Sequence, residues 1–351
     1  MSVRDQIAET VARIAADHCA TAVVRRADRD AAAPLWRELA AAGLDRATAP
    51  EAAGGAGLSW RDALPLVMAV GEYAMPVPLA ESLAAHALAG AAGCALPAAG
   101  AAGFARLARD GDALVAGSVA WGDRIETLVG VDGGGSVRLL PVAWASCEHT
   151  CNQAGEVRSR MTWRDGSAAT GSVRADALAS LGAALRAAQL AGALRRVLAM
   201  TVRYAGEREQ FGRPIGRFQA VQQQMALMAE LVVQASIGAE LAFDDGGASD
   251  GGGPLPDPVR AACAKQVASA NALQCAAIAH AVHGAIGVTE EFDLQLFTRR
   301  LRAWAAEWGG AHHWATVLGR KLLEGGRASV WHAVIDASSS PPAGPVPGRT
   351  D

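Results

Sequence analysis

Between Arg203 and Met225 the chain reads RYAGEREQFGRPIGRFQAVQQQM. This pattern predicts a helix, a tight turn and a second helix. Gly212 permits a positive φ where the first helix stops, and Pro214 sets the turn that follows. A guanidinium held near a helix end presents a planar fork of donors that suits a diphosphate. We therefore expect Arg208 to lie close to the start of the second helix, where it can meet such a group.

The same stretch resembles the acyl-CoA dehydrogenase family, because eight of its residues recur at the family's spacing. They are Arg208, Gln210, Phe211, Gly212, Pro214, Ile215, Phe218 and Gln219. An isolated R-x-Q-F-G is typical of an ordinary helical hairpin with a solvated arginine, whereas eight matches favour a cofactor site. In the family this segment crosses a subunit interface, where the arginine meets the FAD pyrophosphate and the phenylalanine and glutamine hold the adenine half. The resemblance thus implies FAD contacts from all of these residues except the turn-forming Gly212 and Pro214.

A second landmark, AVHGAIGVTEEFDL, runs from Ala281 to Leu294. It resembles the stretch Q-x-x-G-G-x-G-x-T-x-E that lies against the FAD phosphates of a neighbouring subunit in the family. Gly284 and Gly287 keep their places, and a missing side chain lets backbone N–H groups approach a phosphate. Ala281 replaces the glutamine and Ala285 replaces the second glycine. The resemblance adds Gly284 and Ala285 to the expected cofactor contacts.

The family's reaction requires a base, and this chain does not have one at the usual position. Family members remove a proton from the α-carbon of the thioester with a carboxylate, while hydride leaves the β-carbon for the flavin. In most members the glutamate precedes the last helix, where this chain has Trp308; Glu307 lies one residue earlier. A one-residue shift on a helix turns a side chain by about 100°. A minority of members carry the glutamate before the R-x-Q-F-G helix, but Leu178 to Gly192 contains no acid.

Three hypotheses follow from the missing base. In the first, the chain is the non-catalytic subunit of a heteromeric acyl-CoA dehydrogenase, a kind known in the family among enzymes acting on steroid side chains, and it completes the FAD site of a partner that carries the base. In the second, it is a self-sufficient homo-oligomer that uses Glu307, or else Glu290 or Glu291, as base. In the third, it is a flavin-free relative. We favour the first, because the segments that grip FAD across an interface are present and the base is missing.

The resemblance implies a reaction and its partners. The reaction is the α,β-dehydrogenation of an acyl-CoA thioester, with electrons leaving through an electron-transfer flavoprotein. The assembly is expected to be a dimer or tetramer, either a heterotetramer with a second acyl-CoA dehydrogenase subunit or a homo-oligomer. It would serve fatty acid or steroid side-chain catabolism.

Composition along the chain predicts four parts of a mostly α-helical protein. We expect an N-terminal helical domain over 1–95, a small β-domain over 96–174, a C-terminal four-helix bundle over 175–336 and a disordered tail over 337–351. The glycine cluster from Ala52 to Ser59 is expected to break the N-terminal helices. Another glycine-rich segment, GGASDGGGPLPDP, is expected to be a loop within the bundle.

The expected β-domain reads as short strands but lacks the family's flavin motifs. The runs ALVAGSVAW, TLVGV and SVRLLPVAW, which begin at Ala113, Thr127 and Ser136, alternate around turn residues as strands do. In the family this domain covers the isoalloxazine ring with the motifs T-E-x-x-x-G-S and W-I-T-N. Neither motif occurs here. Half of a flavin site is therefore missing from this chain.

Charge and apolar patterning narrow the class of partner. A formal net charge of −3 argues against nucleic acid and against a membrane surface held by basic residues. By our interpretation no apolar run is long enough to span a bilayer, and the first residues carry no secretion signal. We expect a cytoplasmic location.

Two groups of residues have a metal-like appearance. Cys147, His149 and Cys151 alternate in CEHTC, yet no second ligand pair with finger-like spacing follows. His312 and His313 are adjacent, and neighbouring helical residues point about 100° apart. The six cysteines are otherwise scattered, as is usual for reduced thiols. We expect no metal.

Overall fold

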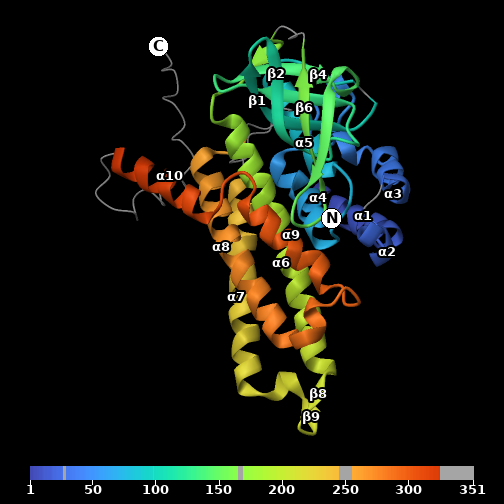
Figure 1. The fold of residues 1–351 in the computed structure, drawn as a ribbon, viewed down its shortest axis with the longest axis vertical. Coiled ribbons are helices and arrows are strands. Elements are labelled where there is room, and N and C mark those ends of the chain that lie inside the picture. Colours follow the sequence, from blue (N-terminus) through green and yellow to red (C-terminus); the bar gives the residue numbers. More distant parts are fainter. Residues whose placement is uncertain (27–28, 98, 165–168, 245–254, 325–351) are drawn as a thin grey trace, which may run out of the picture.

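The computed structural model describes residues 1–26, 29–97, 99–164, 169–244 and 255–324. The expected tail over 337–351 and most of the glycine-rich loop lie outside the described residues. Figure 1 shows three parts: short N-terminal helices, a β-sheet at one end, and long helices that extend away from both. The chain passes through them in that order.

Five helices form the N-terminal part, and the glycine cluster separates the third from the fourth as predicted. They are α1 (Val3–His18), α2 (Thr21–Arg26), α3 (Arg29–Ala41), α4 (Trp60–Glu72) and α5 (Leu79–Ala91). Ser2 begins α1 with a capping box to Asp5. Ser59 ends the glycine cluster and caps α4, accepting a hydrogen bond from the backbone N–H of Asp62. Local side-chain chemistry thus fixes where both helices begin.

The middle part is a seven-stranded sheet, and the three predicted runs are three of its strands, β2, β3 and β4. The strands are β1 (Ala102–Asp110), β2 (Ala113–Ala120), β3 (Thr127–Val131), β4 (Ser136–Pro141), β5 (Ser146–Cys151), β6 (Val157–Trp163) and β7 (Gly171–Ser172). Their order is β5-β6-β2-β1-β3-β4-β7, with β1 and β3 parallel and the other pairs antiparallel. One face holds a small core that includes Leu107, Leu128 and Trp163. The other face of β1, β2 and β6 is turned towards the helices.

Within the described residues, five helices form the C-terminal part. They are α6 (Ala177–Glu207), α7 (Gln219–Ala242), α8 (Pro258–His283), α9 (Leu294–Ala306) and α10 (Ala311–Glu324). The first four pack on one another as the predicted bundle, and α10 packs on α8. The predicted apolar positions of α6 are fully buried at Leu190, Leu194 and Val197. Burial of this stripe holds the longest helix at the centre of the protein.

Two of these helices are long and apolar enough to cross a membrane by length and composition alone, which corrects the expectation that no such run exists. In α6, 94% of the most apolar window is buried inside the protein, whereas in α7 only 33% is buried. The burial of α6 accounts for its composition, and the exposed apolar side of α7 requires another explanation.

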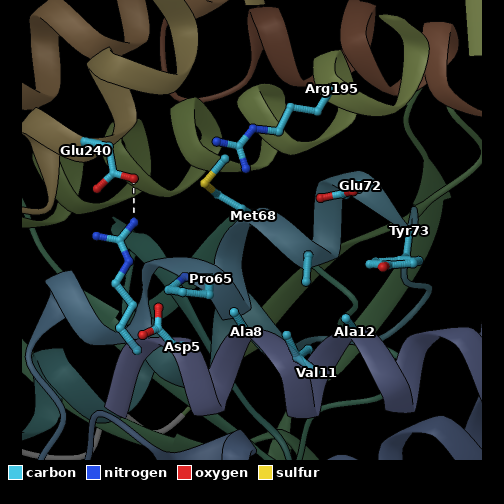
Figure 2. A pocket seen from close by; sticks show the side chains of 12 residues that line it. Asp5, Ala8, Val11, Ala12, Pro65, Met68, Glu72, Tyr73, Arg195 and Glu240 are labelled. Atoms are coloured by element: carbon cyan, nitrogen blue, oxygen red, sulfur yellow. Dashed lines mark hydrogen bonds and ion pairs between the residues drawn. The ribbon is translucent and has the colours of Figure 1, made fainter. Parts of the chain in front are cut away.

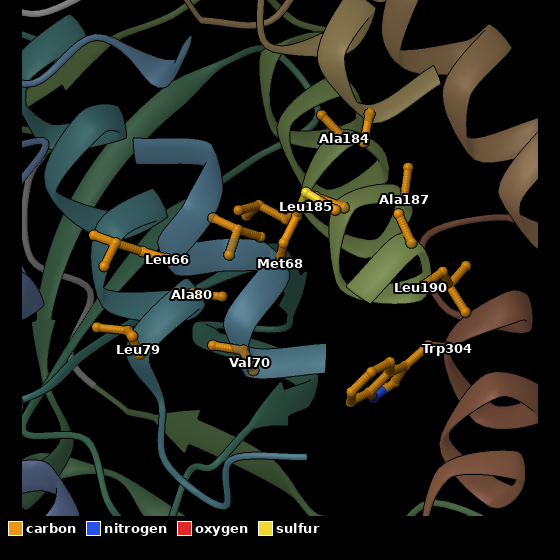
Figure 3. Close-up of a cluster of buried hydrophobic side chains, with 14 of the residues drawn as sticks. Leu66, Met68, Val70, Leu79, Ala80, Ala184, Leu185, Ala187, Leu190 and Trp304 are labelled. Atoms are coloured by element: carbon orange, nitrogen blue, oxygen red, sulfur yellow. The ribbon is translucent and has the colours of Figure 1, made fainter. Parts of the chain in front are cut away.

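Two glycines bring α4 and α6 into close contact. A Cβ on Gly71 would lie 1.9 Å from the carbonyl oxygen of Gln189, and a Cβ on Gly192 would lie 1.9 Å from that of Met68. Figure 3 shows side chains of α4, α5 and α6 meeting at this crossing, with Trp304 on the side of α9. Because the backbones touch, the crossing has no space for even a methyl group.

We predict that Gly192→Ala lowers the free energy of unfolding by about 1–3 kcal/mol, because the helices must separate to admit the added carbon. The matched control is Gly206→Ala, later in the same helix, where a Cβ would meet nothing within 4 Å. That change should stabilise the protein slightly, since alanine favours a helix by about 1 kcal/mol over glycine. Urea denaturation measures both. Equal effects would show that the close approach is unimportant.

Candidate functional site

The predicted cofactor segment folds as a two-residue hairpin rather than as a simple turn between helices. Its strands, β8 (Glu209–Gln210) and β9 (Arg213–Pro214), pair antiparallel. Gly212 has φ of +79°, as predicted, and Phe211 has φ of +52°. Positive φ at both central residues is what a type I′ hairpin turn needs. The hairpin escaped sequence analysis because phenylalanine seldom adopts this conformation, so the usual Asn-Gly signal was missing.

Most of the predicted cofactor residues on this hairpin point away from the chain's own core. Arg208, Gln210, Phe211 and Gln219 are exposed, and Phe211 is 91% exposed. The side chain of Arg208 has no hydrogen bond or ion pair with any residue that the structure describes. Such a large exposed aromatic ring beside a free guanidinium indicates a surface that is covered by something else.

Two of the predicted residues instead anchor the hairpin. Ile215 is buried, and it packs with Val282 and the half-buried Phe218 in a small apolar cluster. The guanidinium of Arg213 lies 4.2 Å from the centroid of the Phe218 ring. These contacts fix the hairpin at the end of the bundle and leave its remaining side chains free to bind.

The cluster also brings the two sequence landmarks together, although they are distant in the chain. The Tyr204 hydroxyl donates to the carbonyl oxygen of His283 over 3.3 Å, and their rings stack with centroids 4.4 Å apart. His283 is buried, in agreement with a packing role. Next to it, Gly284 has φ of +64° with open space where a Cβ would stand, and Ala285 is exposed. Figure 1 shows β8 and β9 at the far end of the bundle from the sheet.

This end of the bundle fits one side of a dinucleotide. It offers a free guanidinium for a diphosphate, an open glycine backbone, and an exposed aromatic ring with two exposed amide side chains. None of these groups lines the cavity between α1, α4, α6 and α7 or the cavity between the sheet and the helices. The residues fit FAD if a second chain supplies the other side.

The second candidate site, around Glu307, lies at the opposite end of the bundle. The carboxylate accepts hydrogen bonds at Oε1 from Arg158 Nη2 at 2.6 Å and from Asn152 Nδ2 at 2.9 Å. At Oε2 it accepts one from Arg186 Nε at 2.8 Å. Burial by itself would raise the pKa of Glu307, but the charges of Arg186 and Arg158 outweigh it and lower the pKa. A carboxylate held in this way is a poor proton acceptor.

The arginines around Glu307 belong to a larger buried ion network. Glu156 accepts from Arg300 Nε at 3.1 Å and from the Trp304 indole N–H at 2.8 Å, and it pairs with Arg158 at 3.2 Å. Burial opposes its charge, yet the neighbouring arginines hold the pKa of Glu156 down at about 2. The network joins β6, α6 and α9, so it fixes the sheet against the helices.

Sequence analysis missed this network. Arg186 interrupts an otherwise apolar run in α6, and an unpaired charge is rarely buried. Arg186 was the signal in the sequence that could have predicted the network, because a buried arginine needs an acidic partner elsewhere in the fold.

Glu307 and Trp308 lie in a turn after α9 and not on a helix, which corrects the helical argument about their directions. Glu307 is the C-terminal cap residue of α9 with extended backbone, and Trp308 has φ of +57°. The Lys265 ammonium donates to the carbonyl oxygens of Trp304 and Ala305 and so secures the end of α9. The two side chains still point in different directions, because Glu307 has an extended backbone and Trp308 has a positive φ.

Trp308 occupies the position expected for the family's glutamate. Its ring stacks on Phe104 of β1, with centroids 5.1 Å apart and an interplanar angle of 10°. A Cβ on Gly182 would come within 2.3 Å of the indole, so this glycine of α6 makes room for it. The structure therefore places an apolar ring, and no acid, where the base was expected.

The two candidate sites are too far apart to serve one small substrate. Arg186 lies within α6 and Arg208 is the C-terminal cap residue of the same helix, so the helix between them is about 33 Å long at 1.5 Å per residue. Glu307 is hydrogen-bonded to Arg186, whereas Arg208 lies at the cofactor hairpin. Within one chain, Glu307 therefore cannot act beside the diphosphate end of a cofactor held at the hairpin.

The other candidate groups do not form a reactive cluster. Glu290 and Glu291 are exposed, and their backbone carbonyl oxygens accept from Arg25 of α2. His312 and His313 are both exposed on α10. Among the described residues, no three His, Cys, Asp or Glu side chains are grouped as a metal site would need.

A cavity of about 290 Å³ lies between α1, α4, α6 and α7. Figure 2 shows its lining, with an ion pair between Glu240 and Arg4 across one side. None of the predicted site residues lines this cavity.

Comparison with known families places the fold. Residues 3–96 match the model of the acyl-CoA dehydrogenase N-terminal domain, and residues 171–314 match that of the acyl-CoA dehydrogenase C-terminal domain. The chain belongs to the acyl-CoA dehydrogenase family. It is therefore an oxidoreductase of the class that acts on acyl-CoA, and FAD is the cofactor of that class.

Among curated proteins, the chain is similar to two from Mycobacterium tuberculosis. It is 31% identical to acyl-CoA dehydrogenase IpdE2, over 85% of this chain and 90% of that protein. It is also 31% identical to acyl-CoA dehydrogenase FadE34, over 84% of this chain but 44% of that longer protein.

Among solved structures, the chain resembles the steroid ACAD Tcur3481–Tcur3483, with a TM-score of 0.78 and 26% identity over 92% of this chain and 98% of that one. The ChsE4–ChsE5 complex from Mycobacterium tuberculosis aligns with a TM-score of 0.75 and 24% identity, over 92% of this chain and 98% of that one. The second likeness shows the shared fold alone.

We predict that Glu156→Gln lowers the free energy of unfolding at pH 7 by about 3–5 kcal/mol, because it leaves Arg300 without its buried partner. The pKa of Glu156 is depressed from an ordinary 4.5 to about 2, so its contribution is complete above pH 4.5 and is lost as the pH falls towards 2. Denaturation across this range should show a shallower acid slope in the variant. The exposed Glu148→Gln on β5 is the control and should leave the slope unchanged.

Proposed function

We propose that this chain is the non-catalytic subunit of a heteromeric acyl-CoA dehydrogenase and completes the FAD site of a partner that carries the base. One observation carries the proposal: Glu307, the acid nearest to the expected base position, is neutralised by Arg158 and Arg186 and has a lowered pKa. A base for removing a carbon-bound proton needs a pKa near the working pH. The two arginines paired with Glu307 lower its pKa and so oppose that role.

The cofactor hairpin supports a shared site. Its free Arg208 would pair with the diphosphate of FAD, the ring of Phe211 would cover the adenine half, and Gln210 and Gln219 would add hydrogen bonds. Gly284 and Ala285 would let backbone N–H groups approach the phosphates. Bound FAD supplies the acceptor for the hydride that leaves the β-carbon of the acyl group. This chain's part is to hold and orient one side of the cofactor.

The exposed apolar side of α7 supports a protein partner. Leu227, Val233, Ile237 and Leu241 are all exposed and follow one another along the helix. The apolar composition of α7 is explained if a second subunit covers this side. A heterotetramer would bury it, as would a homo-oligomer. The partner chain and a cytoplasmic location both belong to the proposal.

The substrate and the electron acceptor are extensions of the same proposal. The solved neighbour Tcur3481–Tcur3483 is described as a steroid ACAD, and ChsE4–ChsE5 is described as a complex of two chains. We infer a bulky acyl-CoA, such as one with a sterol-derived acyl group, and an electron-transfer flavoprotein as the acceptor.

A self-sufficient homo-oligomer with Glu307 as base is the second candidate. One observation favours it, since Glu307 lines a cavity of about 560 Å³ between the sheet and the helices. To act there, the carboxylate would have to leave two arginines.

We predict that Arg208→Ala weakens FAD binding by the mixed complex about 10- to 100-fold, because one charge-assisted contact is worth about 1.5–3 kcal/mol. Flavin absorbance per complex measures the loss. The control is Arg203→Ala, an exposed arginine in the same helix outside the eight matches. Full flavin retention in Arg208→Ala would remove the cofactor assignment.

We predict that Glu307→Gln leaves most of the kcat of the mixed complex intact, because the partner supplies the base. Acyl-CoA-dependent flavin reduction in stopped flow measures the step. If the variant folds and holds flavin but reduces it at least about 1,000-fold more slowly, Glu307 is the base and the second candidate is correct.

A further inference from the structure

The cavity of about 560 Å³ lies on the open face of the sheet, and its walls differ from one side to the other. β1, β2 and β6 form one wall, and α5, α6 and the turn after α9 form the other. The stacked rings of Phe104 and Trp308 and the small side chains of Ala108, Val115 and Ala120 make much of the lining apolar. Such a lining suits a compact apolar body.

Two arginines on the sheet side of the cavity are not held in an ion pair within the described residues, although Glu148 of β5 lies opposite one of them, Arg160, in the strand register. Arg158 and Arg186 also line it, but they are paired with acids. Arg106 of β1 and Arg160 of β6 are exposed, and neither side chain has an ion pair or hydrogen bond with any residue in the described part of the chain. Asp110 lines the cavity too, but it lies about 13 Å along β1 from Arg106.

The strand register places Arg106 and Arg160 on either side of Gly117 in β2. β1 pairs Leu107 with Ala116 of β2, so Arg106 lies beside Gly117. The register of β2 with β6 shifts between Ala116 and Val119, which places Arg160 on the other side of the same irregularity. Across two strand spacings the two Cα atoms are about 10 Å apart. A Cβ on Gly117 would meet nothing within 4 Å, so no side chain lies directly over this glycine.

The lining of the cavity also includes a polar atom that has no hydrogen-bond partner among the described residues. Glu81 of α5 is 3% exposed, and one of its oxygens pairs with Arg186 at 3.2 Å. The other oxygen, Oε2, has no hydrogen-bond partner among the described residues. A buried carboxyl oxygen without a partner is costly, so a polar group of a ligand there would be favourable.

We propose that this cavity binds a carboxylate attached to a compact apolar body, with its charge between Arg106 and Arg160 above Gly117. Paired guanidinium groups suit a carboxylate, and the apolar body would lie against Trp308 and Phe104. Since both arginines line the cavity itself, the anionic group has to be next to the apolar body. A coenzyme A thioester places its phosphates at the far end of a long neutral arm and matches this arrangement less well. The proposal goes beyond the function proposed above and does not require it.

Calorimetric titration of the purified chain and of the mixed complex tests the proposal, with octanoate, octanol and octanoyl-CoA as probes. We expect octanoate to bind, and to bind at least about 10-fold more weakly to Arg106→Ala and Arg160→Ala, since each loses a charge-assisted contact. Arg109→Ala is the matched control, because Arg109 alternates to the other face of the same strand and does not line the cavity. Octanol, which has the same body without charge, should bind equally to all three variants.

Three outcomes would overturn the proposal: no binding of octanoate, equal weakening by Arg109→Ala, or binding of octanoyl-CoA with no binding of octanoate. The arginines are exposed, so the variants should fold, and circular dichroism checks this. Arg208→Ala separates the two proposals, because it should remove flavin from the mixed complex and leave octanoate binding unchanged.

Discussion

The buried ion pairs between Glu307 and the two arginines at its sides are the contact on which the arrangement of this protein depends. Arg158 comes from the sheet and Arg186 from the central helix, so the carboxylate joins these two parts. Removing water from three charges is costly, and only their mutual pairing offsets that cost. The same pairing lowers the pKa of Glu307 and so makes it a poor base. Structural stability and loss of basicity thus have one cause.

The position of the cofactor hairpin follows from the length of α6. A single uninterrupted helix carries Arg186 near the sheet and ends beside Arg208 at the other end of the bundle. Because α6 is unbroken, its two ends cannot approach each other, and Gly71 and Gly192 allow it to pack tightly against α4. In the function proposed above, the hairpin would therefore present its cofactor contacts to a neighbouring subunit.

The sequence predicted features that depend on residues close together in the chain, and it did not predict features that depend on distant residues. The N-terminal helices, the break from Ala52 to Ser59 and the strands beginning at Ala113, Thr127 and Ser136 were predicted, because helical periodicity and strand alternation involve residues close in the chain. The β8–β9 hairpin was missed, since Phe211 adopts a positive φ that its residue type disfavours. The ion network was missed because Arg300 and Glu307 are more than a hundred residues along the chain from Glu156, Arg158 and Arg186.

The sequence by itself determined the family, the helical and strand composition, and the identity of the residues that could grip a dinucleotide. The spacing of eight residues between Arg208 and Gln219 sufficed to indicate the family, because that pattern is local in the chain. Only the tertiary structure decided what Glu307, Trp308 and Arg186 do. Their roles depend on which charges and rings meet across the interface between sheet and helices, and burial there turns a carboxylate into an ion-pair partner. Ion pairs between residues so distant in the chain depend on the fold, and no periodic pattern in the sequence indicates them.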